Sequence, residues 1–136
     1  MAWVVDTCLL LDIGLDDPLF AEKSERLLER KLAEGLLVCP VTFVELAPAF
    51  SGQIKAQGEF LLQLGIEYRE SWAWEDTTHA SRAWTDQVLK RRSKQASKRP
   101  VADVLIGAFA SRFQGLLTRN GADFHKLFPK LPIIQP

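Results

Sequence analysis

Four acidic residues stand where a carboxylate is available for chemistry. Each follows an apolar, strand-forming run or lies in the first turn of a predicted helix. They are Asp6, Glu45, Asp103 and Asp123. The carboxyl ends of parallel strands meet at one edge of a sheet, and open α/β folds bind their ligands at that edge. If the strands of this chain are parallel, the four carboxylates lie along one edge.

Carboxylates gathered at one edge require a cation. Two of them about 5 Å apart repel by roughly 3 kcal/mol at an effective dielectric constant near 20. No Lys or Arg lies in the immediate flanks of Asp6, Glu45 or Asp103, although Arg119 is near Asp123. An all-oxygen set suits a hard divalent ion, Mg²⁺ or Mn²⁺, and such an ion supports phosphodiester hydrolysis. The four acids are therefore candidate catalytic and metal-binding residues.

Each acid also has a purely structural interpretation. Asp6 and Asp123 can serve as helix N-caps. Glu45 can complete a capping box with Thr42, and Asp103 can complement the dipole of its helix. Asp103 lies in the most apolar helical segment of the chain, where a carboxylate needs a partner or a cleft. The catalytic interpretation depends on all four acids meeting.

The charge of the chain is unevenly distributed. Lys plus Arg and Asp plus Glu each number 17, yet residues 90–99 hold six bases and no acid. Eleven bases then face seventeen acids in the rest of the chain. The six basic residues, called the basic strip below, are Lys90, Arg91, Arg92, Lys94, Lys98 and Arg99. They are candidate RNA-binding residues that hold a phosphate backbone by charge, and a solvated surface loop is the alternative.

Short apolar runs alternate with helical segments along the 136 residues, which are expected to form a single domain, 1–136. Strands are predicted at residues 2–5, 36–39, 66–69, 116–118 and 132–134. A helix or turn is predicted at 7–11, and helical segments are predicted at 18–34, 42–47, 53–64, 74–92, 101–113 and 122–127. Pro40 is expected to end a strand, Pro48 to kink or end a helix, and Gly115 to end another. The alternation predicts a layered βα fold.

Several protein classes lack support in the sequence. No apolar run is long enough to cross a membrane, no cleavable leader is evident, and a cytoplasmic protein is expected. Cys8 and Cys39 are expected to be small buried hydrophobes, and His79 and His125 lack a second ligand motif for zinc. There is no Walker loop or GxGxxG motif for a nucleotide cofactor. The acids Asp12, Asp16 and Asp17 are expected in a solvated loop with a helix cap, with Asp12 near the site as an alternative.

Four segments together resemble the successive motifs of the PIN domain, and specifically the toxin ribonucleases (VapC) of VapBC toxin–antitoxin pairs. The segments are Val4-Val5-Asp6-Thr7, Phe43-Val44-Glu45-Leu46, residues 102–108 (Ala-Asp-Val-Leu-Ile-Gly-Ala) and residues 117–124 (Leu-Thr-Arg-Asn-Gly-Ala-Asp-Phe). The resemblance implies a three-layer α/β/α sandwich around a mostly parallel sheet. It also implies a Mg²⁺- or Mn²⁺-dependent endoribonuclease, a hydrolase that forms a homodimer and is inhibited by a small cognate antitoxin.

The resemblance also implies roles for individual residues. Asp6, Glu45 and Asp103 match the acidic triad of the family. The fourth position aligns either with Asp123 or with Asn120, whose amide can bind a metal water but supplies no charge.

Further positions match supporting parts of the family site. Thr7 and Thr118 match hydroxyls that support the acids. Cys8 departs from the Ser or Asn that often follows Asp-Thr. For Trp72, Trp74 and Trp84, core packing is expected first, and an antitoxin groove or a dimer surface second.

Two other functions fit parts of the pattern. A non-catalytic PIN-like module that binds RNA or protein shares the fold, but retention of the three central acids argues against it. A flavodoxin-like phosphoacceptor domain shares an Asp after a strand. It also requires a lysine in the last third of the chain. Lys126 and Lys130 are poorly placed after the turn to be that lysine.

Overall fold

The computed structural model describes residues 2–92 and 101–136. The strands are β1 (Trp3–Val5), β2 (Leu36–Leu37), β3 (Ile66–Glu67), β4 (Gly115–Leu117) and β5 (Ile133–Ile134). The α-helices are α1 (Thr7–Gly14), α2 (Ala21–Lys31), α3 (Pro40–Leu46), α4 (Ile54–Gln63), α5 (Trp74–Arg92), α6 (Val101–Ala110) and α7 (Gly121–Leu127). Short 3₁₀ segments, η1 (Leu32–Glu34) and η2 (Ala47–Phe50), follow α2 and α3.

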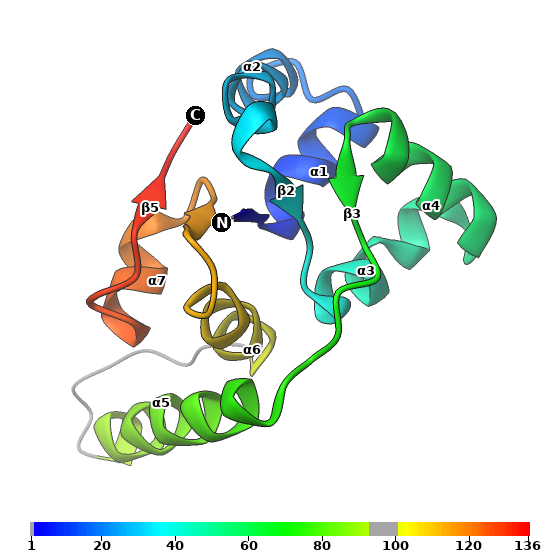
Figure 1. The fold of residues 1–136 in the computed structure, drawn as a ribbon. Coiled ribbons are helices and arrows are strands. Elements are labelled where there is room, and N and C mark those ends of the chain that lie inside the picture. The colour runs from blue at the N-terminus through cyan, green and yellow to red at the C-terminus, as the bar shows by residue number, and fades with distance from the viewer. Residues whose placement is uncertain (1, 93–100) are drawn as a thin grey trace.

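The strands form one parallel sheet in the order β3-β2-β1-β4-β5 (Figure 1). From β1 the chain builds outward through β2 to β3, and it then returns to the other side of β1 to add β4 and β5. The strand order therefore reverses between β1 and β4. In parallel α/β sheets, the carboxyl ends of two such strands flank the usual ligand site.

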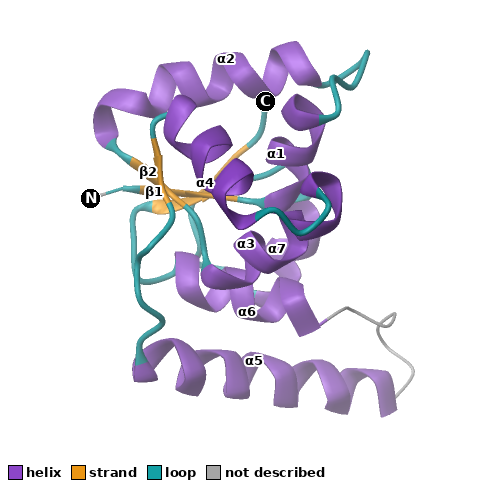
Figure 2. Cartoon of the chain, turned by 90° about the vertical axis from the view of Figure 1, so that its right-hand side faces the viewer, coloured by secondary structure: helices purple, strands orange, loops and turns teal. Residues whose placement is uncertain are grey.

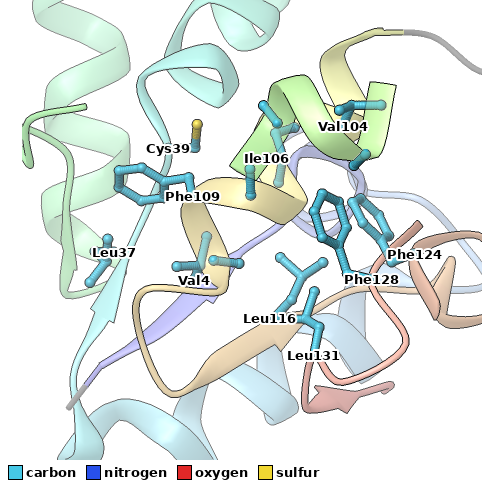
Figure 3. Close-up of a cluster of buried hydrophobic side chains, with 14 residues drawn as sticks. Val4, Leu37, Cys39, Val104, Ile106, Phe109, Leu116, Phe124, Phe128 and Leu131 are labelled. Carbon is cyan, nitrogen blue, oxygen red and sulfur yellow. The ribbon is translucent and has the colours of Figure 1, made fainter. Parts of the chain in front are cut away.

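Successive residues of the central strands point to opposite faces of the sheet, and both faces are buried. Val4 and Leu116 face the core under α6 and α7, and Figure 3 shows them in one cluster with Phe109, Phe124 and Phe128. On the other face, Trp3, Val5 and Leu117 of the sheet form a second core with side chains of α1, α2, α3 and α4. These helices contribute, among others, Leu9, Leu27, Leu46 and Leu61. The predicted three-layer α/β/α sandwich is confirmed.

Helix α5 lies outside these layers and packs on α6 (Figure 2). Arg112, just past α6, donates from Nε and Nη2 to both oxygens of Asp76 in the first turn of α5, at 3.1 and 3.0 Å. Its Nη2 also donates to the Ser71 carbonyl at 2.9 Å. This ion pair, with Asp76 only 1% exposed, fixes α5 to the body of the protein.

Several predicted boundaries differ from the structure, and three of them differ for clear local reasons. Pro40 begins α3 instead of only ending a strand, because its fixed φ suits the first helical position. The helix predicted from residue 18 begins at Ala21, because the Asp17 carboxylate holds the Leu19 and Phe20 amides in a turn.

The third wrong boundary lies at the end of α6. This helix ends at Ala110 and not near Gly115, which starts β4. Of the helices in the described ranges, none is both long and apolar enough to span a bilayer.

Candidate active site at the carboxyl edge of the sheet

Asp6 lies at the end of β1, at the point where the strand order reverses. Its Oδ1 accepts from the Thr7 amide at 2.8 Å, so the predicted N-cap of α1 is confirmed. Its Oδ2 accepts from the Thr118 hydroxyl at 2.7 Å and from the Cys8 thiol at 3.3 Å. Thr118 directly follows β4, so the carboxylate bridges the ends of the two central strands.

Burial raises the pKa of the Asp6 carboxyl above its ordinary value. The hydrogen bonds from Thr118, Cys8 and the Thr7 amide, and the charge of Arg119, act in the opposite direction and do not compensate for the lost hydration. A charged Asp6 is therefore costly in the folded protein. A cation bound at its oxygens would relieve this cost, so the residue fits a site for a hard divalent ion.

Thr7 connects this carboxylate to Glu45. The Thr7 hydroxyl donates to Glu45 Oε1 at 2.6 Å, and it also forms a hydrogen bond with the buried Thr42 hydroxyl at 3.1 Å. The capping-box interpretation of Thr42 and Glu45 is wrong, because α3 begins at Pro40 and Cys39 is its N-cap. Glu45 is instead an exposed acid in the second turn of α3, held toward the end of β1.

Asp103 and Asp123 occupy the first turns of α6 and α7, and both are half-buried. The chain passes from α6 into β4, so α6 runs opposite to the strands and its first turn lies toward their carboxyl ends (Figure 2). The N-cap of α7 is Asn120, so the N-cap interpretation of Asp123 is wrong.

The four carboxylates therefore come from elements that meet at one edge. Within residues 2–92 and 101–136, however, no three His, Cys, Asp or Glu side chains are arranged so that they could hold a metal ion together. The complete metal site stays a prediction.

The segment after β4 supports Asp6 through its backbone. The Asn120 amide donates to the Thr118 hydroxyl oxygen at 3.0 Å, while that hydroxyl donates to Asp6. The Asn120 side chain is exposed and makes no capping hydrogen bond. This geometry explains why Thr118 is fixed, and the choice between Asn120 and Asp123 for the fourth position stays open.

An ion pair beside this segment was not anticipated from the sequence. Arg119 Nε and Nη2 donate to the two oxygens of Asp12 at 2.7 and 2.9 Å, and the Ser24 hydroxyl donates to Asp12 at 3.1 Å. Asp12 is only 5% exposed, so its expected place in a solvated loop is wrong. Arg119 pairs with Asp12, which lies 107 positions away in the sequence.

The two cysteines differ from each other. Burial and the Asp6 charge raise the pKa of the Cys8 thiol to about 12, so it remains a protonated donor to Asp6 at neutral pH. Cys8 is half-buried and polar in its contacts, so the prediction of a small buried hydrophobe is wrong for it. Cys39 is fully buried in the core, as expected, and burial raises its thiol pKa to about 12 as well.

The basic strip is only partly described. Lys90 is exposed near the end of α5, and Arg91 and Arg92 are the last residues of that helix. Lys94, Lys98 and Arg99 lie outside the described residues. The end of α5 lies on the same side of the molecule as the start of α6, which carries Asp103 (Figure 2).

Most of the tryptophan and histidine residues considered in the sequence contact the core or the backbone. Trp72 stacks on Phe109, and Trp72 and Trp84 both pack against the core, as predicted. Trp74 is 78% exposed, so core packing is wrong for it. His79 contacts the Phe128 ring edge-on. His125 lies 3.2 Å from the Leu131 carbonyl.

Comparison with known proteins gives a result at the level of the fold. No protein-family model matches the sequence, and no curated protein matches it. Among solved structures, the chain is similar to a chain in the crystal structure of VapBC2 from Rickettsia felis bound to a DNA fragment from their promoter. The TM-score is 0.75 at 16% sequence identity, over 99% of this chain and 98% of the other. The chain therefore has the PIN-like α/β fold that its sequence motifs implied.

Proposed function

We propose that the protein is a metal-dependent endoribonuclease, the toxin of a type II toxin–antitoxin pair. The observation that carries the proposal is the position of Asp6 at the reversal of strand order. Both of its oxygens are fixed there by groups at the ends of β1 and β4. A buried carboxylate with a raised pKa at a ligand edge is typical of a functional site.

The donors available at this edge fit Mg²⁺ or Mn²⁺. Asp6, Glu45 and Asp103 would hold the ion, with Asp123 or Asn120 at the fourth position. A hard divalent ion supplies Lewis-acid chemistry to phosphodiester hydrolysis, because it makes water more acidic and offsets charge on the phosphate oxygens. Bare carboxylates repel one another, so we expect these side chains to draw together when the ion binds.

The supporting residues orient the acids. Thr118 and the Thr7 amide each hold one oxygen of Asp6 and together orient that carboxylate. Thr7 links Asp6 and Glu45, because its amide donates a hydrogen bond to Asp6 and its hydroxyl donates one to Glu45. The basic strip, which begins with Lys90 in α5, would hold the RNA backbone by charge without reading the bases.

Partners are part of the proposal. The similar solved structure contains a VapBC2 assembly bound to promoter DNA. By likeness of fold, we propose that a small antitoxin protein binds and inhibits this chain, that the chain forms a homodimer, and that it acts in the cytoplasm.

The direct test is cleavage of total cellular RNA by purified protein with Mg²⁺ or Mn²⁺, compared with EDTA. We expect discrete cleavage bands that require the metal and disappear in Asp6→Asn. Asp16→Asn is the matched control, because Asp16 is exposed beyond the far end of α1 and its positive φ of 50° suits Asn.

Two results would contradict the proposal. Cleavage that persists in Asp6→Asn would show that the site around Asp6 does not catalyse RNA hydrolysis. Failure of well-folded wild-type protein to cleave would favour the non-catalytic binding module.

A further inference from the structure

A hollow of about 170 Å³ lies beside the candidate active site. Its lining residues are Phe20, Lys23, Arg119, Gln135 and Pro136, two of which are basic and none of which has an acidic side chain. Arg119 directly follows Thr118, which holds Asp6, so the hollow borders the same edge of the sheet.

The Arg119 guanidinium has a fixed position in this hollow. Nε and Nη2 bind Asp12, and the guanidinium carbon lies 4.1 Å from the centroid of the Phe20 ring. The Arg119 side chain is still 30% exposed. The third guanidinium nitrogen, Nη1, takes no part in the two hydrogen bonds with Asp12, so it is placed to donate to a ligand.

The nearby acids are already engaged. Asp12 accepts from Arg119 and Ser24, and Asp17 accepts from the Leu19 and Phe20 amides. The hydrogen bonds with Asp12, together with the negative charges of Asp12 and Asp17, raise the pKa of Arg119, so it stays cationic.

The opposite wall of the hollow adds further donors. Lys23 is exposed on α2. Gln135 is oriented by its Oε1, which accepts from the Gly121 amide at 2.8 Å, so its NH₂ group is left to donate elsewhere. A guanidinium, an ammonium and an amide around a small hollow are suited to the oxygens of a phosphate group.

We propose that Arg119 and Lys23 form a subsite for a backbone phosphate of the RNA substrate, next to the phosphate that is cleaved. This inference rests on the proposed function for the identity of the substrate. Asp6 belongs to the candidate metal site, and Asp12 binds Arg119 of the subsite. The two acids are six residues apart, which corresponds to about 9 Å along a helix at 1.5 Å per residue. The subsite is therefore a second contact point on an extended strand, distinct from the metal-binding acids.

The test is equilibrium binding of a fluorescein-labelled single-stranded RNA in EDTA, where no metal-dependent cleavage occurs, over a series of KCl concentrations. Lys23→Gln should raise Kd several-fold at low salt and flatten the slope of log K against log salt by about 0.7, the value for one lost phosphate contact. Arg119→Lys, which keeps a charge for Asp12 but loses the planar donor edge, should weaken binding in the same direction.

Lys130→Gln is the matched control and should leave both quantities unchanged. It removes the same charge from an exposed residue in the segment before β5, at the amino edge of the sheet. If the Lys23→Gln variant binds RNA with the same Kd and salt slope as the wild type, the subsite is wrong. The subsite is also wrong if the wild-type protein does not bind RNA.

Cleavage assays with Mn²⁺ separate the two proposals. If wild-type protein cleaves RNA and Lys23→Gln has an unchanged KM, the subsite is wrong and the nuclease stands. If the variants weaken binding as expected but wild-type protein does not cleave, the nuclease is wrong and the subsite stands.

Discussion

Replacing Arg112 by Met should lower the free energy of unfolding by about 3–5 kcal/mol. The Arg112 guanidinium forms two hydrogen bonds with Asp76, at 3.1 and 3.0 Å, and Asp76 is 1% exposed. A unit charge pair 3.0 Å apart is worth about 5 kcal/mol at an effective dielectric constant of 20, before the cost of desolvation. The variant leaves the Asp76 carboxylate buried, with the Ala73 amide as its nearest remaining donor, at 2.9 Å.

The choice of Met isolates the charge. Its side chain preserves much of the packing of Arg112 on Phe109 and Phe113, where the guanidinium lies 5.1 and 4.6 Å from the ring centroids. The double variant Arg112→Met/Asp76→Asn should recover part of the loss, because it removes the unpaired charge.

The assay is urea unfolding followed by far-UV circular dichroism. Arg26→Met is the control, because Arg26 forms an exposed ion pair with Glu22, with side chains 68% and 76% exposed. It should cost less than about 0.5 kcal/mol. A loss below about 1 kcal/mol for Arg112→Met, or an equal loss in the control, would refute the reasoning that this buried pair fixes α5.

Three further predictions concern the candidate site. In metal-free protein, Asp6 has a raised pKa when folded, so the free energy of unfolding should fall as pH rises from about 4 toward that raised pKa. In Asp6→Asn this fall should be absent from the urea midpoints, and identical pH profiles would contradict the assignment. Thr7→Val removes the hydroxyl that binds Glu45 and should cost about 1–2 kcal/mol in urea unfolding, whereas Thr7→Ser should retain most of the stability. Both thiols have pKa values of about 12, so at pH 8 iodoacetamide should modify Cys8 and Cys39 at least roughly a thousand times more slowly than a free thiol. Fast modification of native protein, measured by mass spectrometry, would contradict that expectation.

Locally encoded features were predictable from the sequence. The run before Asp6 forms β1 and its carboxylate caps α1, because both depend on adjacent residues. Helix α5 has the predicted bounds, Trp74–Arg92, and Pro48 lies in the 3₁₀ segment η2 that follows the end of α3. Parallel pairing then brings the ends of β1 and β4 together.

Features that depend on distant residues were not predictable. Asp12 has the surroundings of a loop residue in the sequence, and only the approach of α1 and β4 shows that Arg119 neutralises it. The apolar run after Val101 continues to Phe113, but the helix ends at Ala110, where the chain turns and the Gln114 amide binds the Ala2 carbonyl. Spacing also cannot give the direction of a side chain, so the sequence could bring the acids to one edge but not arrange them around an ion.

The central claim is that the edge around Asp6 binds a divalent cation for RNA hydrolysis. The most direct measurement is anomalous X-ray diffraction from crystals soaked in Mn²⁺, for wild-type protein and for Asp6→Asn. The account predicts an anomalous peak beside the Asp6 carboxylate in the wild type, shared with Glu45 and Asp103 and lost in the variant. A wild-type crystal with no peak at Asp6, or with the same peak in the variant, would contradict it.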